Sequence, residues 1–80
     1  MDFNIKTAYD IGDLVYTAEF YEGYTPNGPC TITGIDIEIS AEKTKIGYCL
    51  TKGDTFIGYV LEDRLFTTCA ECTEWCKKHN

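Results

Sequence analysis

Basic residues are scarce in this sequence, and their absence from one long stretch limits what the protein can bind. Lys and Arg number 7 against 13 Asp and Glu, which gives a formal net charge of −6. No basic residue lies between Lys6 and Lys43. Because nucleic-acid binding depends on neutralising phosphates with Lys and Arg, direct binding to nucleic acid is not expected. The stretch instead predicts a negative surface, supplied by Asp10, Asp13, Glu19, Glu22, Asp36, Glu38 and Glu42.

The sequence also lacks the features of a membrane or exported protein. No window approaches the roughly 18 consecutive apolar residues of a membrane span. The first residues, Met-Asp-Phe-Asn-Ile, lack the basic and apolar regions of a signal peptide. The cysteines number 5, an odd count, and three of them fall in one short stretch, unlike a secreted disulfide framework. We therefore expect a cytoplasmic protein with reduced thiols and no membrane partner.

A catalytic constellation is missing as well. The one histidine, His79, lies next to the last residue, where we expect it to be solvated rather than to act as a base. The 7 glycines stand singly, so they form no phosphate-binding loop. Asp36 and Glu38 share one strand face, but a general-acid pair needs a pocket that raises the pKa of one carboxyl. We expect no enzymatic activity and no cofactor.

What is present fits one small, mainly β domain over residues 1–80, because 80 residues provide for a single core. Apolar residues alternate with polar ones at Phe3 and Ile5 and again in several later runs. This period of two is typical of half-buried strands. Strands are predicted over Leu14–Phe20, Cys30–Ile39, about 46–50 and Thr55–Leu61.

Glycine and proline divide these strands. Tyr21–Pro29 contains Gly23, Pro26, Gly28 and Pro29, which predicts the longest loop of the protein. In Cys30–Ile39 the alternation slips by one residue at Gly34, which predicts a β-bulge or bend there. Gly53 suits a hairpin turn. In Thr55–Leu61 apolar residues occupy both phases, which predicts a strand buried on both faces.

A helix is predicted at the C-terminal end. Thr68-Cys69-Ala70-Glu71 has the pattern of a capping box, in which the threonine hydroxyl and the glutamate satisfy backbone amides of the first turn. The helix should run from about Cys69 to Lys78, with glutamates in its first half and lysines at its end, as the helix dipole favours. The domain would thus consist of a barrel over 1–66 and a helix over 67–80.

Three segments carry a family resemblance: Phe3-Asn4-Ile5-Lys6-Thr7-Ala8-Tyr9-Asp10-Ile11-Gly12-Asp13-Leu14-Val15-Tyr16, then Ile46-Gly47-Tyr48, then Glu62-Asp63-Arg64-Leu65-Phe66-Thr67-Thr68. Together they resemble small, mostly uncharacterised proteins of phages and mobile elements of Gram-positive bacteria. The resemblance implies a mainly β fold, a small SH3-like (Tudor- or KOW-like) bent-sheet barrel with one short C-terminal helix. The strands of that group often carry more lysine than this chain does.

The cysteines allow a metal site or a structural role. Cys69, Cys72, Cys76 and His79 have the composition of a zinc site. On one helix, however, they would extend over about 15 Å, too far for one tetrahedral ion. A metal set made of Cys30 and Cys49 from the strands with Cys69 and Cys72 from the helix stays open, as does thiol redox chemistry at the C-x-x-C of Cys69 and Cys72. The structural alternative is that Cys69, Cys72 and Cys76 form the stripe that packs the helix on the sheet.

Tyrosines near the predicted loop suggest a binding surface. SH3-like and Tudor-like barrels bind peptides or methylated groups with aromatic side chains on loops and strand ends. The alternative is that the tyrosines cover a half-buried sheet surface. The predicted binding residues are Tyr16, Glu19, Tyr21, Glu22, Tyr24, Asp36 and Glu38.

These observations predict a non-enzymatic interaction module whose acidic, tyrosine-rich surface meets a basic protein partner. If the protein comes from a phage, it could modulate a host protein, for example as an anti-defence inhibitor that occupies a basic groove. A small metal-binding or thiol redox protein is the alternative. Self-association through an edge strand of an open barrel is also open.

Overall fold

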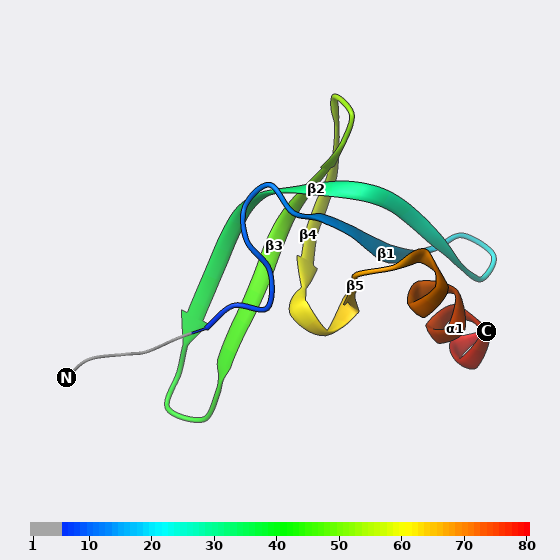
Figure 1. The fold of residues 1–80 in the computed structure, drawn as a ribbon. Coiled ribbons are helices and arrows are strands. Elements are labelled where there is room, and N and C mark those ends of the chain that lie inside the picture. Colours follow the sequence, from blue (N-terminus) through cyan, green and yellow to red (C-terminus); the bar gives the residue numbers. More distant parts are fainter. Residues whose placement is uncertain (1–5) are drawn as a thin grey trace.

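The computed structural model describes residues 6–80 and shows an open, bent antiparallel sheet with one helix at its C-terminal end (Figure 1). The elements are β1 (Leu14–Phe20), β2 (Tyr24–Ile39), β3 (Thr44–Lys52), β4 (Thr55–Leu61), the short 3-10 helix η1 (Glu62–Arg64), β5 (Leu65–Phe66) and α1 (Cys69–His79). The strand order is β4-β3-β2-β1-β5. The prediction of a mainly β fold with a C-terminal helix is confirmed. The alternation at Phe3 and Ile5 lies outside the described residues.

Strands β1 and β4 have the predicted bounds, and α1 ends one residue later than predicted. The threonine half of the predicted capping box is confirmed, because the hydroxyl of Thr68 accepts the backbone N–H of Glu71 at 3.1 Å. The glutamate half differs, since the carboxylate of Glu71 accepts hydrogen bonds from the hydroxyls of Thr67 (3.2 Å) and Thr68 (3.3 Å) and not from a backbone amide. The side chain of Glu71 thus lies in the first turn, where the helix dipole stabilises a negative charge.

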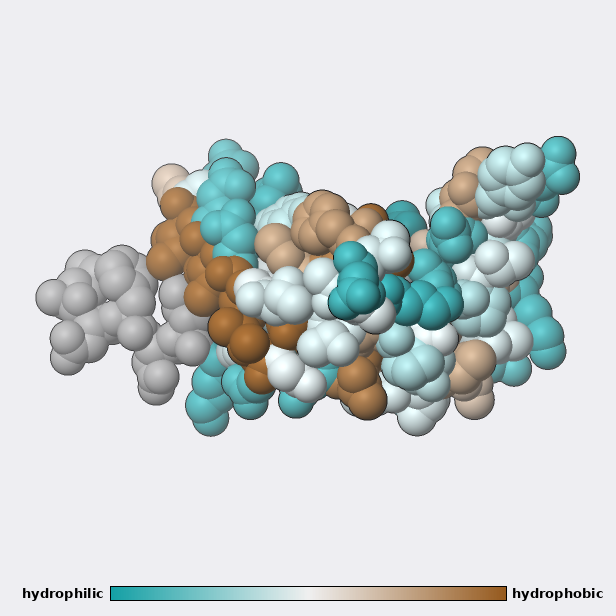
Figure 2. Space-filling model, turned by 90° about the horizontal axis from the view of Figure 1, so that it is seen from above, coloured by the Kyte–Doolittle hydropathy of each residue, from teal (hydrophilic) through white to brown (hydrophobic). Residues whose placement is uncertain are grey.

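The predicted irregularity at Gly34 is confirmed. Ile32 pairs with Leu50, whereas Gly34 pairs with Cys49, so β2 carries one extra residue between these pairs. Beyond this shift β2 and β3 continue as a long hairpin toward the left of Figure 1. Ile37 and Ile39 in this part are 40% and 49% exposed. Figure 2 accordingly shows apolar residues gathered at the left-hand end of the molecule.

The prediction of a loop over Tyr21–Pro29 is wrong, because β2 begins at Tyr24 and only residues 21–23 connect it to β1. Pro26 pairs with Ala18 in this part of β2, while β3 pairs with β2 only from Thr31 onward. The prolines therefore lie where β2 has one neighbour among the described strands, and a proline is tolerated in a strand that has a free edge.

Gly28 and Pro29, two further turn-forming residues, lie in a β-bulge of β2. Val15 pairs with Cys30, but Thr17 pairs with Asn27, so β2 holds one more residue than β1 between these pairs. Gly28 lies in this bulge with φ +152, and a Cβ there would lie 2.6 Å from Cδ1 of Tyr16. Glycine is required because the ring of Tyr16 occupies the space that a side chain would need.

The prediction that Thr55–Leu61 is buried on both faces is also wrong. β4 is one of the two edge strands of the described sheet. Its side chains of Phe56, Tyr59 and Leu61 are 64%, 48% and 39% exposed. Apolar residues in both phases of a short strand do not distinguish a central strand from an edge strand, because the pattern says nothing of the strand's neighbours.

One face of the sheet carries the core. Its buried members come from four strands and are Val15, Cys30, Ile32, Tyr48, Leu50 and Leu65. Helix α1 packs against the other face: Leu65 is in the core, Phe66 points the opposite way, and the ring of Phe66 lies 6.1 Å from that of Trp75 in α1. The sheet thus has the core on one face and the helix over one end of the other.

A buried tyrosine joins three parts of the chain at the edge of the core. The hydroxyl of Tyr48, which is fully buried, donates to the carboxylate of Glu62 in η1 at 2.5 Å. The same carboxylate oxygen accepts the N–H of Ala8 at 3.1 Å. The N–H of Tyr9 reaches the Tyr48 hydroxyl at 3.4 Å, and the two rings meet edge to face with centroids 5.6 Å apart. Burial, followed by the hydrogen bond to Glu62, raises the pKa of Tyr48 to about 12.

Candidate functional site: the tip of the first hairpin

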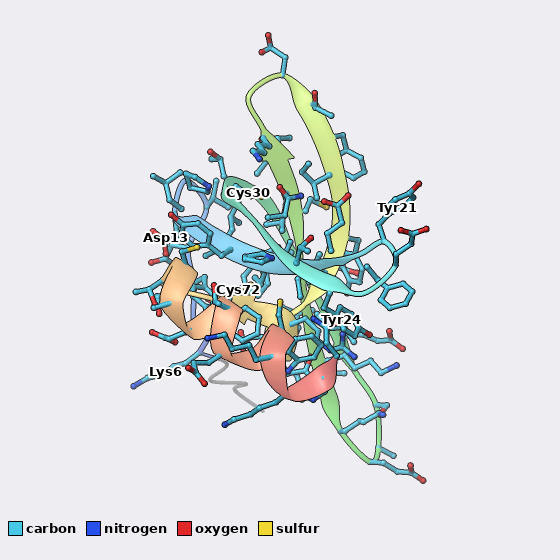
Figure 3. The ribbon with its side chains drawn as sticks, turned by 90° about the vertical axis from the view of Figure 1, so that its right-hand side faces the viewer. Lys6, Asp13, Tyr21, Tyr24, Cys30 and Cys72 are labelled. Carbon is cyan, nitrogen blue, oxygen red and sulfur yellow. The ribbon has the colours of Figure 1, made fainter. Side chains whose placement is uncertain are left out.

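The turn between β1 and β2 presents large aromatic side chains to solvent. We call residues 19–24 the hairpin tip. Phe20 and Tyr21 are 68% and 81% exposed, and the carboxylates of Glu19 and Glu22 on either side are exposed as well. In Figure 3 the side chain of Tyr21 points away from the body of the protein. The tip thus combines two exposed aromatic rings with two negative charges.

The conformation of the tip is fixed by its own backbone. The N–H of Tyr21 donates to the carbonyl of Gly23 at 2.9 Å. Glu22, between these two residues, has φ +54, a left-handed conformation that is uncommon for a residue other than glycine. Gly23 follows with φ +128. A turn this tight leaves the side chains at its apex with few contacts of their own.

Asn80, which directly follows α1, binds the backbone of the hairpin tip. The side-chain oxygen of Asn80 accepts the N–H of Tyr24 at 2.5 Å, and its amide donates to the carbonyl of Tyr24 at 2.9 Å. An added Cβ at Gly23 would lie 3.2 Å from the same Asn80 oxygen, so the glycine allows this close approach. The two hydrogen bonds attach the C-terminal residue to the start of β2.

Aromatic rings continue this attachment into the body of the protein. Tyr24 meets Phe20 and Trp75 edge to face, with centroids 5.0 and 4.8 Å apart. The imidazole of His79 stacks on Trp75 at 3.9 Å, and the guanidinium of Arg64 lies 4.7 Å from the Trp75 ring. A shallow surface hollow beside these rings is lined by Phe20, Glu22, Gly23, Tyr24, Thr25, His79 and Asn80. The tip is therefore a supported surface rather than a free loop.

The structure divides the seven predicted binding residues into separate groups. Glu19, Tyr21, Glu22 and Tyr24 lie together at the tip, although Tyr24 turns toward α1. Tyr16 is half-buried in β1 with its ring against Gly28. Asp36 and Glu38 lie near the opposite end of the 16-residue strand β2 (Figure 1). The tip and the Asp36–Glu38 segment are therefore not one surface.

Sequence reasoning missed Phe20 and Tyr59 as exposed aromatic residues. In the sequence, Phe20 has the pattern of the last apolar residue of a strand. Its side chain is exposed because the strand ends at a turn, which the structure shows. The ring of Tyr59 lies over Gly47, where an added Cβ would come within 2.0 Å of it. Partial desolvation and the nearby charges of Asp36 and Glu38 raise the pKa of Tyr59. No local signal in the sequence places Tyr59 beside these carboxylates, because the three residues come from two strands separated by β3.

The cysteines are distributed differently from the predicted metal set. Cys30 is buried in the core, whereas Cys49 pairs with Gly34 and lies beside Leu50, a core residue, so that it points to the other face of the sheet. Both helical members of the set lie in α1, where Cys72 is buried and Cys69 is exposed. Within residues 6–80 no group of three or more His, Cys, Asp or Glu side chains is arranged to hold a metal ion. The structure does not bring the four cysteines together.

Two of the three helical cysteines pack α1 on the sheet as the structural alternative predicts. Cys72 and Cys76 are buried and Cys69 is exposed. Burial, the Cys76 thiol and Cys69 raise the pKa of Cys72 to about 11, and burial raises the pKa of Cys30. A raised thiol pKa disfavours the nucleophilic thiolate.

Thiol reactivity should follow this division. We expect a disulfide exchange reagent to label Cys69 rapidly in the native protein. Cys30, Cys72 and Cys76 should react only when the protein opens, at least about 1,000-fold more slowly for a domain of ordinary stability. Time-resolved labelling with mass spectrometry measures each rate. Cys69→Ser should remove the fast phase, and rapid labelling of Cys72 in folded protein would contradict the prediction.

Comparison of the chain with known protein-family models, with curated proteins and with solved structures gives no match. Within the described residues, no helix has the length and apolar character needed to cross a membrane. What is established is therefore the architecture, an open five-stranded antiparallel sheet with a helix on one face.

Proposed function

We propose that this protein is a non-enzymatic interaction module that binds a basic protein partner through the hairpin tip. The observation that carries the proposal is the pair Phe20 and Tyr21, 68% and 81% exposed between two glutamates on a supported turn. Large aromatic side chains at the centre of an interface commonly supply most of its binding energy.

The support under the tip matters because binding costs entropy. A partner that meets a free loop must order it, at about 0.5 to 1.5 kcal/mol for each immobilised side chain. Here the Asn80 hydrogen bonds to Tyr24 and the ring contacts of Tyr24 with Phe20 and Trp75 already fix the backbone of the tip. The backbone of the hairpin tip is therefore preorganised, which lowers the entropy cost of binding.

The charge of the protein favours a basic partner. The net charge is −6, and the sequence from residue 7 to residue 42 has no Lys or Arg. A positive partner would be steered toward this part of the molecule and would pair with Glu19 and Glu22 at the tip. A phage or mobile-element protein that occupies the basic groove of a host enzyme would have these properties, and the five free cysteines suit the reducing cytoplasm in which such a protein would act.

The finer fold assignment is part of the same proposal. An SH3-like barrel is supported by the bent sheet, by the return of β5 to pair with β1, and by η1 between β4 and β5. In such barrels, loops and strand ends carry the peptide-binding aromatic residues. The hairpin tip of this protein occupies a corresponding position at the end of β1.

A photo-crosslinking amino acid placed at position 21 tests the proposal. In a lysate of the organism that encodes the protein, it should crosslink to a basic protein. The same amino acid at position 56, which is comparably exposed on β4, should not capture that protein. With the captured partner purified, calorimetry should show that Tyr21→Ala weakens binding at least about 10-fold, the loss of a modest hot spot.

Charge reversal at matched sites separates the tip from the rest of the acidic surface. Glu19→Lys and Glu38→Lys change the net charge equally, and both side chains are exposed. Glu19 lies in β1 opposite Thr25 near the start of β2, whereas Glu38 lies near the end of β2. Glu19→Lys should weaken binding more than Glu38→Lys and should reduce its dependence on salt. Equal effects of the two reversals, or affinity that is independent of salt, would contradict binding through the tip.

A further inference from the structure

The ring of Tyr59 lies on the sheet over a residue that has no side chain. Tyr59 pairs with Cys49 of β3, but its ring extends to Gly47. A Cβ added at Gly47 would lie 2.0 Å from both Cζ and the hydroxyl oxygen of Tyr59 and 2.4 Å from Cε2, which places it above the face of the ring. Gly47 is buried, whereas Tyr59 is 48% exposed. The backbone of Gly47 therefore supports one face of the ring, and the other face is open to solvent.

The carboxylate of Asp36 lies beside this ring. Asp36 of β2 pairs with Gly47, and paired residues of an antiparallel sheet point to the same face with their Cβ atoms about 5 Å apart. The phenol of Tyr59 occupies the place of the missing Gly47 side chain, so it is the cross-strand neighbour of Asp36. Partial desolvation raises the pKa of Tyr59, and the charges of Asp36 and then Glu38 raise it further. The electrostatic potential at the ring is therefore negative.

Asp36 and Glu38 differ in the residue that each faces across the sheet. Glu38 pairs with Lys45, so a positive charge lies directly opposite its carboxylate. Asp36 pairs with a glycine, and Lys45 is only its diagonal neighbour, at the greater Cβ distance of about 7 Å. On its other side β1 pairs only with the first half of β2. The charge of Asp36 is therefore less compensated by the described strands than the charge of Glu38.

The surface around Tyr59 and Asp36 is open to solvent within the described part of the chain. Their partners in β3 alternate with the core residue Tyr48, so both side chains lie on the face of the sheet opposite to the core. Helix α1 lies on the same face but packs against β1, β2 and β5, toward the right of Figure 1. Asp36 is exposed, so a partner can reach the carboxylate and the ring together.

We infer that Tyr59 and Asp36 form a binding site for an arginine side chain of a protein partner. A guanidinium is planar, so it can stack on the open face of the ring while its N–H groups pair with the carboxylate. The ring is already held on Gly47, so its immobilisation costs little entropy when the partner binds. A cationic occupant fits the net charge of −6 and the negative potential at the ring. The site is separate from the hairpin tip and does not rest on the proposed function.

An NMR titration of the isotope-labelled full chain tests the inference. The probe is a short peptide of alternating glycine and arginine. The amides of Gly47, Cys49 and Tyr59 should shift and saturate, with a dissociation constant on the order of millimolar. A peptide with citrulline in place of arginine keeps the shape without the charge, and it should not shift these amides. A peptide with lysine in place of arginine should bind at least about 3-fold more weakly, because an ammonium group lacks the planar fork.

Two substitutions that remove the same charge separate this site from the general negative field. Asp36→Asn should raise the dissociation constant of the arginine peptide at least about 3-fold, the value of one exposed ion pair. Glu38→Gln is the matched control, since its carboxylate lies on the same strand and face but opposite Lys45, and it should change the dissociation constant less than about 1.5-fold. Tyr59→Leu keeps an apolar side chain without the aromatic face and should weaken binding at least about 3-fold.

The comparison of peptides uses the unmodified protein, so it does not depend on the folding of a variant. The inference would be overturned if the arginine peptide gave no saturable shift at Gly47, Cys49 and Tyr59, or if the citrulline peptide gave the same shift. Equal losses from Asp36→Asn and Glu38→Gln would overturn it too. The amides of the hairpin tip report separately on binding at the tip, so failure at either site is recognised independently of the other.

Discussion

Gly28→Ala is expected to destabilise the protein by about 2 to 5 kcal/mol, from backbone strain together with steric overlap. The φ of +152 at this residue is unfavourable for a side chain. The added Cβ would also lie 2.6 Å from Cδ1 of Tyr16 and 3.0 Å from the carbonyl oxygen of Val15. Because the backbone of β1 supplies one of these contacts, rotation of the Tyr16 ring alone cannot relieve the overlap. Equilibrium urea unfolding measures the loss.

Gly12→Ala is the matched control for this substitution. Gly12 also has a positive φ, +96, but a Cβ there would meet no atom within 4 Å. Gly12→Ala should therefore lower the free energy of unfolding only through backbone strain, by about 1 to 2 kcal/mol. If Gly28→Ala were no more destabilising than Gly12→Ala, the contact between Gly28 and Tyr16 would not be a determinant of the first hairpin.

The same contact explains why the start of β2 could not be predicted from the sequence. Gly23, Pro26, Gly28 and Pro29 have the composition of a loop, and their density is a sound local signal. In the structure, the bulge at Gly28 accommodates the ring of Tyr16, and Pro26 lies where β2 has no second neighbour among the described strands. Both conditions depend on which strands pair, and residues of a single segment do not specify that.

Other elements could be predicted because their signals are local. The bounds of Leu14–Phe20 and Thr55–Leu61, the slip of phase at Gly34 and the cap at Thr68 all follow from residues within a few positions of one another. The position of Thr55–Leu61 at the edge of the sheet could not be predicted, because it depends on the order of all the strands.

The candidate site was predictable to the same extent. Glu19, Tyr21, Glu22 and Tyr24 are neighbours in the sequence and remain neighbours in the fold. Asp36 and Glu38 were assigned to the same surface only because they are negatively charged. In the structure, most of the length of β2 separates these two residues from the hairpin tip. The attachment of the tip by Asn80 and Trp75 joins residues more than 50 positions apart, which only the folded chain reveals.

Alkaline pH should unfold the protein in part through Tyr48. Burial and the hydrogen bond to Glu62 raise the pKa of this phenol from the ordinary value of 10.0 to about 12 in the folded state. Between these values the unfolded chain loses the phenolic proton while the folded protein keeps it, so the free energy of unfolding falls as pH rises. The contribution of Tyr48 is fully present below pH 10 and is lost by about pH 12. It amounts to about 2 to 3 kcal/mol, since one pKa unit corresponds to about 1.4 kcal/mol.

Tyr48→Phe isolates this contribution. At neutral pH the variant should lose only about 1 kcal/mol, the net value of one hydrogen bond, because the N–H of Ala8 still donates to the Glu62 carboxylate. Between pH 10 and 12 its free energy of unfolding should fall less steeply than that of the wild type. Urea unfolding at several pH values measures both effects.

Cys72→Ala provides the contrast, because its range of pH begins and ends about one unit lower and overlaps that of Tyr48 only between pH 10 and 11. The pKa of this thiol rises from 9.0 to about 11 through burial and the neighbouring Cys76, so the contribution of Cys72 is lost between these pH values. Removing the thiol should make the free energy of unfolding fall less steeply between pH 9 and 11. It should leave the fall above pH 11, which depends on Tyr48, unchanged. If Tyr48→Phe left the fall in the free energy of unfolding above pH 11 unchanged, or if Cys72→Ala removed that fall as fully as Tyr48→Phe does, the buried pair of Tyr48 and Glu62 would not control the alkaline limit of the fold.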